Sequence, residues 1–316
     1  MTGTSGRAST SADAVEVARP SLVTCCQALV GLPVGVVRPR RPDSRFLASL
    51  TDHGLPTSAT TVDVITLPQR TRMVPTPGVA EGVWRPVRSP NRVNAFVIRH
   101  PQATFVVDPG VCVDVHSRAV AELPWILRVA VSPPRDVVDI RRALDLAGID
   151  ATDLDFALPT HLHWDHVAGL LDLPALPVHL HRPEYTWMMQ DRIAPQGGVR
   201  PSLLDRPVTL YDLDGPPILT FPRSRDVFGD RSVILVPLPG HTPASIGLLV
   251  QTTSGPMLLA GDAVWSHVQI DRFRQKASYP GLLADADRAV AWETQHRLYA
   301  VRERVTIVPS HDHGGH

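Results

Sequence analysis

A chain of 316 residues is long enough for one large domain or two ordinary ones, and a hydrophobic content of 43% can fill a sizeable core. Its 31 basic and 31 acidic residues give a formal net charge of zero. The chain therefore has no overall basic field for nucleic acid or an anionic membrane, and we expect neither as a partner. The three cysteines, Cys25, Cys26 and Cys112, do not make a disulfide framework and predict reduced thiols in a cytoplasmic protein.

The first sixty residues are the least regular part of the sequence. Residues 1–14 are rich in Ser, Thr, Gly and Ala, a composition typical of disorder. Residues 21–37 are more apolar, but Gln27 and Pro33 interrupt them and they are too short to span a membrane. Export through a secretory signal is the alternative, although the segment lacks a clear small-residue cleavage site. We expect residues 1–60 to be an N-terminal extension outside a domain formed by residues 61–316.

Predicted strands and helices alternate after this extension. The predicted strands cover residues 62–67, 93–98 and 104–107, and the predicted helices cover residues 135–147 and 284–299. Gly148 follows the first helix directly, where a glycine commonly ends a helix. Sheets and helices in this order predict packed layers of strands with helices outside. The longest irregular stretches, residues 111–134 and 186–222, are predicted loops over a functional site.

The most informative segment is residues 160–166, with the sequence Thr-His-Leu-His-Trp-Asp-His. It follows a short apolar run, residues 154–158, that a proline ends. Four side chains that can bind a metal therefore lie on a loop at the end of a strand: His161, His163, Asp165 and His166. Imidazole nitrogen and carboxylate oxygen suit zinc, and they also serve iron, manganese or cobalt. A polar loop that is merely rich in histidine is the alternative.

Three later apolar runs end in the same manner. Residues 233–238 lead to Pro-Gly-His241-Thr, residues 257–260 lead to Gly-Asp262, and residues 305–308 lead to Pro-Ser-His311-Asp. Gly, Pro and Asp are common at strand ends, so each run taken singly is ordinary turn chemistry. Four ligand-bearing strand ends in one chain predict a metal centre.

This ordered set resembles the metallo-β-lactamase superfamily. The HxHxDH motif of that family corresponds to residues 161–166, and its later ligands correspond to His241, Asp262 and His311. The strand before Asp108 resembles the first motif of the family, whose Asp supports the metal loop from behind. Residues 239–245 and 310–312 most resemble the N-acyl-homoserine lactonase branch. That branch carries a Tyr at the position of Trp265.

The resemblance implies an α/β fold, an αββα sandwich of two mixed sheets with outer helices. It also implies two zinc ions per chain, or other divalent metals, with Asp262 as the bridging ligand. One metal would be held by His161, His163 and His241, and the other by Asp165, His166 and His311. Asp165 is also the expected catalytic residue, and Asp108 would orient a ligating histidine. Four further residues are expected to line a substrate pocket: Trp164, Trp265, His267 and Tyr279.

Two metal ions that share a hydroxide can hydrolyse an ester or lactone, so we expect this reaction on a small-molecule substrate. One alternative is a thioesterase similar to glyoxalase II, although that group carries a helical domain beyond its last ligand and this chain ends soon after His311. Another is an oxidoreductase similar to the persulfide dioxygenases, which use a single iron. A non-catalytic metal-binding module is the third. A class B β-lactamase is disfavoured because its commonest type places Cys at the position of Asp262.

A homodimer is compatible with the sequence, which does not set the oligomeric state.

Overall fold

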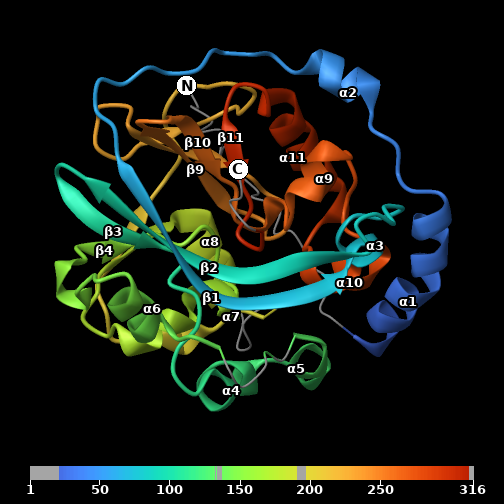
Figure 1. The fold of residues 1–316 in the computed structure, drawn as a ribbon, viewed down its shortest axis with the longest axis horizontal. Coiled ribbons are helices and arrows are strands. Elements are labelled where there is room, and N and C mark those ends of the chain that lie inside the picture. The colour runs from blue at the N-terminus through green and yellow to red at the C-terminus, as the bar shows by residue number, and fades with distance from the viewer. Residues whose placement is uncertain (1–20, 132, 134–136, 191–196, 313–316) are drawn as a thin grey trace, which may run out of the picture.

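The computed structural model describes residues 21–131, 133, 137–190 and 197–312. It contains two mixed sheets, of six and five strands, with helices on their outer faces (Figure 1). The strands of the first sheet, in spatial order, are β1 (Asp63–Pro75), β2 (Arg88–His100), β3 (Ala103–Val107), β4 (Phe156–Ala157), β5 (Val178–His181) and β6 (Val208–Tyr211). Those of the second are β11 (Thr306–Val308), β10 (Gly255–Leu259), β9 (Ile246–Thr252), β8 (Val233–Pro237) and β7 (Arg225–Asp226). The expected sandwich of two mixed sheets is confirmed.

The helices follow the layered order that the sequence predicts. Those that lie between strands of the first sheet in the chain are α3 (Thr76–Val79), α4 (Val115–Arg118), α5 (Trp125–Val131), α6 (Ile140–Leu146), α7 (Trp164–Val167) and α8 (Arg182–Met189). Those that follow β10 are α9 (His267–Asp271), α10 (Ser278–Ala284) and α11 (Arg288–Val301). Two helices precede all the strands, α1 (Leu22–Val37) and α2 (Ser44–Ser49). None of the helices in the described ranges is long and apolar enough to cross a bilayer.

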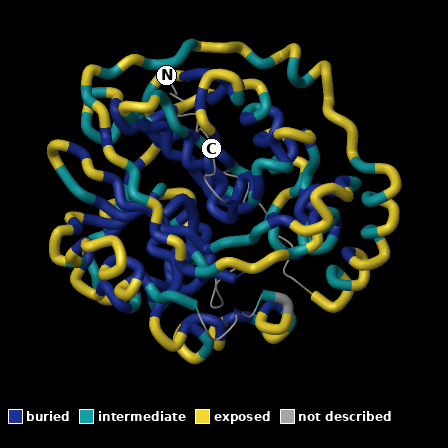
Figure 2. Tube along the Cα trace, viewed as in Figure 1, coloured by how far each residue is buried: buried dark blue, intermediate teal, exposed yellow. Residues whose placement is uncertain are grey.

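Alternating side chains of β2 fill two different layers of the core. Phe96 and Ile98 pack between the two sheets, whereas Ala95 and Val97 face the helices outside the first sheet. This division follows from the two-residue period of a strand. Each large side chain that is buried contributes about 1.5–3 kcal/mol to folding, so both layers fix the position of the sheet. Buried residues accordingly concentrate along the strands (Figure 2).

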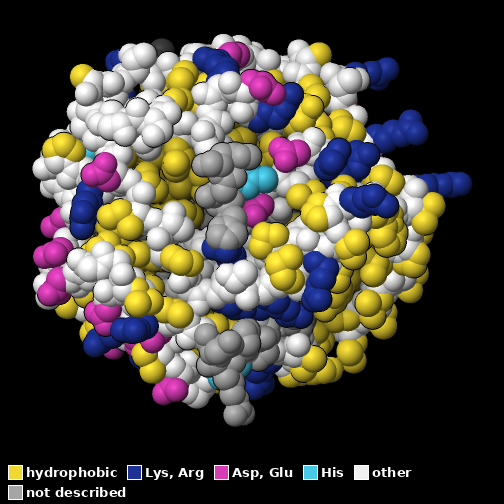
Figure 3. Space-filling view, viewed as in Figure 1, with side chains coloured by type: hydrophobic (Ala, Val, Ile, Leu, Met, Phe, Trp, Pro, Cys, Tyr) yellow, Lys and Arg dark blue, Asp and Glu magenta, His cyan; other side chains and the backbone are white. Residues whose placement is uncertain are grey.

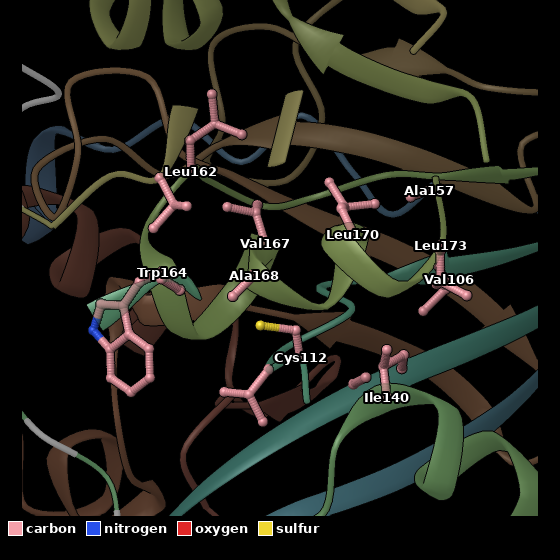
Figure 4. Packing of buried hydrophobic residues seen from close by; sticks show 14 of the residues in the cluster. Val106, Cys112, Ile140, Ala157, Leu162, Trp164, Val167, Ala168, Leu170 and Leu173 are labelled. Atoms are coloured by element: carbon pink, nitrogen blue, oxygen red, sulfur yellow. The ribbon is translucent and has the colours of Figure 1, made fainter. Parts of the chain in front are cut away.

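Helix α7 and the loop that precedes it pack in the core layer outside the first sheet. Leu162, Val167 and Leu170 point into one apolar cluster with Cys112 and Ile140 (Figure 4). Apolar residues within and directly after the predicted ligand motif therefore fasten the loop to the fold. Cys112 is buried and free, and burial raises the pKa of its thiol to about 11, which keeps it neutral and unreactive.

Several predicted elements have different bounds in the structure. β1 and β2 form one long hairpin, paired from Asp63–Arg99 to Pro75–Arg88, although prolines and arginines interrupt its apolar pattern. The first predicted helix begins only at Ile140, because the side chain of Asp139 caps it at the backbone N–H of Arg142. The second begins at Arg288, after the capping residue Asp287. The predicted loops contain α4, α5 and β6. The disorder expected for residues 1–14 lies outside the described residues.

Candidate metal centre

All seven expected ligands lie where strands of the two sheets end. The first four follow β4, His241 follows β8, and Asp262 lies in a short turn after β10. β10 and β11 are parallel neighbours, so the carboxyl ends that carry Asp262 and His311 lie side by side. The sandwich thus brings residues that are up to 150 positions apart (His161 to His311) to one edge.

Two glycines allow the chain to turn directly from a strand into the site. Gly240 has a φ of 124°, and a Cβ there would lie 2.2 Å from the backbone nitrogen of Ala291 in α11. Gly261 has a φ of 51°, and a Cβ there would lie 2.7 Å from Oγ1 of Thr160. A larger side chain at either position would push His241 or Asp262 away from the cluster, which explains why these strands break at glycine.

The ligand atoms form three overlapping groups in which the atoms lie within 4.8 Å of one another. The groups are His161, His163 and His241; His161, His166 and Asp262; and Asp165, His166 and His311. The Asp262 carboxylate lies between them. Its Oδ1 is 3.2 Å from His166 Nε2 and 3.1 Å from His311 Nε2, and its Oδ2 is 3.2 Å from His241 Nε2. Two ligands of one tetrahedral zinc are about 3.3 Å apart, so these separations suit metal binding.

Buried ligand atoms that lack a well-aligned hydrogen bond support the same interpretation. Nε2 of His161, Nε2 of His166 and Oδ1 of Asp262 are buried and make no well-aligned hydrogen bond within the described ranges. Buried polar atoms are rarely left in this state unless something else binds them. His161 and His166 each belong to two of the three groups. This set of imidazoles and carboxylates fits two divalent metal ions better than one.

The electrostatics of the cluster prepare most of its histidines to bind metal. Burial, reinforced by the neighbouring imidazoles, holds the pKa of His161 and of His163 well below the usual value, so both imidazoles are neutral, which is the form that binds metal. Burial and the nearby Lys276 ammonium lower the pKa of His241 as well. Burial opposes ionisation of Asp262, but the His311 and His166 imidazoles outweigh it and lower its pKa far below the usual range.

Asp108 supports the metal loop from behind. Its Oδ2 accepts a hydrogen bond from His166 Nδ1 at 2.9 Å, and its two oxygens accept the N–H and the hydroxyl of Thr160 at 2.6 and 2.8 Å. The carboxylates of Asp108 and Asp262 outweigh burial and raise the pKa of His166 well above its usual value. Asp108 itself has a φ of 50°, a left-handed conformation that Asp adopts more readily than most residues. These bonds turn Nε2 of His166 towards the cluster.

Three buried residues at the site were missed by sequence reasoning. Glu184 in α8 accepts the N–H of Leu162 at 3.1 Å and the hydroxyl of Thr242 at 2.8 Å, so it joins the two loops that carry ligands. Burial raises its pKa to about 7. The other two, Asp285 and Lys276, lie behind His241. No motif marks Glu184 or Asp285, but a single lysine among many arginines was a signal that could have drawn attention to Lys276.

A cavity of about 570 Å³ opens from the cluster. Trp164, Trp265 and Tyr279 line it, as do five of the expected ligands: His163, Asp165, His241, Asp262 and His311. His267 lies outside the lining. Its ring nitrogens face Asp312 Oδ2 and the carbonyl of Ile307, so it braces the loop that follows Asp262.

These features define a hydrolase of the metallo-β-lactamase type. The sequence profile of the Metallo-beta-lactamase superfamily matches residues 88–311, and the chain belongs to this family. It is a metal-dependent hydrolase. The chain is 29% identical to the N-acyl homoserine lactonase AttM of Rhizobium radiobacter over 225 residues, which are 69% of this chain and 80% of that protein. It is also 27% identical to the acyl-coenzyme A thioesterase MBLAC2 of Gallus gallus. That match extends over 207 residues, which are 58% of this chain and 61% of that protein.

Solved structures share the fold at low sequence identity. A quorum-quenching N-acyl homoserine lactone lactonase superposes with a TM-score of 0.58 at 19% identity, covering 81% of this chain and 94% of its own. The dizinc quorum-quenching lactonase AidC superposes with a TM-score of 0.55 at 12% identity, covering 81% and 92%. The curated relatives named N-acyl homoserine lactonase AttM confirm the resemblance to the lactonase branch noted in the sequence.

Proposed function

We propose that the protein hydrolyses lactones that carry an apolar acyl chain, and that it does so with two divalent metal ions, zinc being the expected one. His161, His163 and His241 would hold one ion, Asp165, His166 and His311 the other, and Asp262 would bridge them. When bound, the pair would supply a water that loses its proton near neutral pH and would polarise the carbonyl oxygen of the substrate.

The chain's own residues fix the geometry that this chemistry requires. Asp108 holds the imidazole of His166, and Asp285 holds that of His241, so that both Nε2 atoms face Asp262. Trp265 donates its indole N–H to Asp262 and orients the bridging carboxylate. A site held on strand ends by such bonds needs little rearrangement when the substrate binds.

The observation that carries the substrate class is the largely apolar lining of the cavity that opens from the expected ligands. Five of the expected ligands line the cavity, and most of its other lining side chains are apolar, among them Leu32 and Val36 of α1, Leu127 of α5 and Leu283 of α10. A ring that is opened at the metals would place an apolar chain against these walls, where its burial contributes about 0.8 kcal/mol for each CH₂. The relatives named N-acyl homoserine lactonases support the same class.

A thioesterase is the second candidate, supported by the relative named as an acyl-coenzyme A thioesterase. Its substrate would also present an acyl chain, but with a large anionic leaving group. The cavity lining also includes Arg70 and Arg72, whose positive charges suit such a group.

A hydrolysis panel separates the candidates. Zinc-loaded protein should be assayed on N-acyl homoserine lactones of short, medium and long chain, on aryl esters and on acyl-coenzyme A thioesters. We expect kcat/KM to be higher for lactones than for thioesters and to rise with chain length. Strong thioester cleavage with no lactone or ester turnover would contradict the proposal.

Elemental analysis tests the number of metals independently of the substrate. The wild type should carry about two zinc ions per chain at saturating zinc, and His241→Ala and His166→Ala should each lose about one. A wild-type content that stays at one would instead favour the mononuclear oxidoreductase.

A further inference from the structure

Lys276 is the only lysine of the chain, and it is buried with 3% of its surface exposed. Every other basic side chain apart from histidine is arginine. Lysine is almost never fully buried in proteins unless its ammonium is paired, because removing that charge from water is costly. Its position in the fold therefore needs a specific reason.

The ammonium of Lys276 contacts three parts of the metal centre from behind. Its Nζ donates to the backbone carbonyl of Asp262 at 3.0 Å and to Oδ1 of Asp285 at 2.6 Å. It also lies 4.7 Å from the ring centroid of Trp265, within the range of a cation–π contact. The same Oδ1 of Asp285 is 3.0 Å from His241 Nδ1. One buried charge thus reaches two expected ligands and the tryptophan that binds one of them.

Asp285 lies between Lys276 and His241 in this arrangement. Its carboxylate is buried, and the same oxygen faces both the Lys276 ammonium and Nδ1 of His241. Neither Lys276 nor Asp285 lines the cavity, so neither touches a substrate there. A buried pair of this kind seldom adds net stability over an apolar pair of similar volume. Its contacts point instead to the orientation of the ligands.

We propose that Lys276 and Asp285 form a positioning pair. Asp285 accepts the Nδ1 proton of His241, which fixes the imidazole with Nε2 towards Asp262 and His163. Lys276 fixes Asp285 and, through the carbonyl of Asp262, the turn that carries the bridging carboxylate. The pair thereby sets the affinity of the metal bound by His163 and His241. This inference rests on the metal centre of the proposed function but not on its substrate.

Zinc affinity measured by competition with a chromophoric chelator tests the pair directly. Asp285→Asn and Lys276→Met should each weaken one of the two zinc ions about 10–100-fold, the range typical of partners that orient a ligating histidine. The other ion should bind as in the wild type. Lys276→Arg keeps the positive charge and should restore part of the affinity. The double variant should lose less than the sum of the single losses, because part of the effect of Lys276 reaches His241 through Asp285.

A matched control separates positioning from general stability. Asp172 is buried and paired with Arg118, and it contacts none of the expected ligands. Asp172→Asn should lower the melting temperature without changing zinc affinity. An equal loss of zinc affinity in Asp172→Asn, or unchanged affinity in both Asp285→Asn and Lys276→Met, would overturn the proposal. A wild type that binds no zinc would refute the metal centre itself, which is a distinct outcome.

The single lysine also gives a spectroscopic readout that needs no turnover. Protein labelled isotopically at lysine should show one set of side-chain resonances, all from Lys276. Zinc addition to the wild type should shift them, because the Asp262 carbonyl and Asp285 change their surroundings when their partners bind metal. Resonances that remain unmoved at saturating zinc would contradict a role for Lys276 in the metal centre.

Discussion

The indole Nε1 of Trp265 donates a hydrogen bond of 2.8 Å to Oδ2 of Asp262, the carboxylate at the middle of the ligand cluster. The lactonase branch that the sequence resembles has a Tyr at this position. A tyrosine hydroxyl can both donate and accept, whereas an indole has one N–H and accepts nothing. In this protein that N–H is used on Asp262, the proposed bridging ligand, so Trp265 contacts the ligand cluster and also lines the cavity.

Trp265→Phe should therefore affect the metals more than substrate binding. The change keeps an aromatic wall but removes the hydrogen bond to Asp262, and we expect zinc affinity and kcat to fall about 10-fold with little change in KM. Zinc competition and steady-state kinetics on the best lactone measure both effects. A raised KM with unchanged zinc affinity would show that the indole contacts the substrate instead. Trp265→Tyr is the matched variant that restores a donor.

The positions of the candidate ligands could be predicted from the sequence because strand ends are marked locally. An apolar run followed by Gly or Pro and then His or Asp marks both the end of a strand and a candidate ligand, as at His241 and Asp262. The residues that orient those ligands carry no such mark. Asp285 and Glu184 look like ordinary polar residues of a loop and a helix until the fold brings them behind the site.

The layered fold could be predicted from the sequence, but the lengths of its strands and helices could not. The hydrophobic pattern of β2 indicates a strand only over its buried centre, and the outer part of the hairpin with β1 pairs through its backbone with exposed polar side chains such as Arg72. Backbone pairing leaves no periodic trace when the side chains face solvent. The position of α1 beside the cavity could not be predicted either, because α1 packs against α10, which lies far from it in the sequence.

Asp262→Asn tests the bridging carboxylate. The amide keeps the size of the side chain but loses its charge, and a neutral amide is a poor bridge between two cations. We expect loss of about one zinc ion and a fall in kcat of at least about 100-fold, beyond the upper range for residues that only orient a ligand. Circular dichroism should show that the fold survives.

Asp312→Asn is the control for Asp262→Asn. Asp312 accepts hydrogen bonds of 2.7 Å from the hydroxyl of Ser266 and from the N–H of His267, so it fastens the loop after the bridging residue. Loss of its charge should cost about 1–3 kcal/mol of stability while zinc content stays near two. Near-wild-type turnover in Asp262→Asn, or greater metal loss in Asp312→Asn, would contradict the ligand assignment.

Glu184→Gln should change how stability depends on pH. Burial raises the pKa of Glu184 from about 4.5 to about 7, so between these values the folded protein holds a proton that the unfolded chain has released. The free energy of unfolding should therefore fall as pH rises through this window, by on the order of 3 kcal/mol. The variant lacks the titrating group and should lack this slope. Chemical denaturation of both proteins under the same metal conditions gives the difference, and parallel pH profiles would rule out the raised pKa.

Helix α1 presents two contrasting faces. Leu32 and Val36 line the cavity, whereas Val30 is 75% exposed on the outer side. Hydrophobic side chains gather over this part of the surface (Figure 3). The helix precedes the segment that matches the family profile, so its side of the cavity is supplied by residues outside that match.

Leu32→Trp should shorten the acyl chain that the cavity accepts. The larger ring would fill space along the apolar wall, and we expect KM to rise about 10-fold or more for long-chain lactones, since a single methylene in an apolar pocket changes discrimination by about 1–3 kcal/mol. Short-chain lactones, which reach only the metal end, should keep their kcat and KM. Val30→Trp places the same ring on the exposed face of the helix and should change neither. Kinetics across the chain-length series decide the matter: equal losses for short and long chains in Leu32→Trp would mean that α1 supports the fold of the site and does not select the chain.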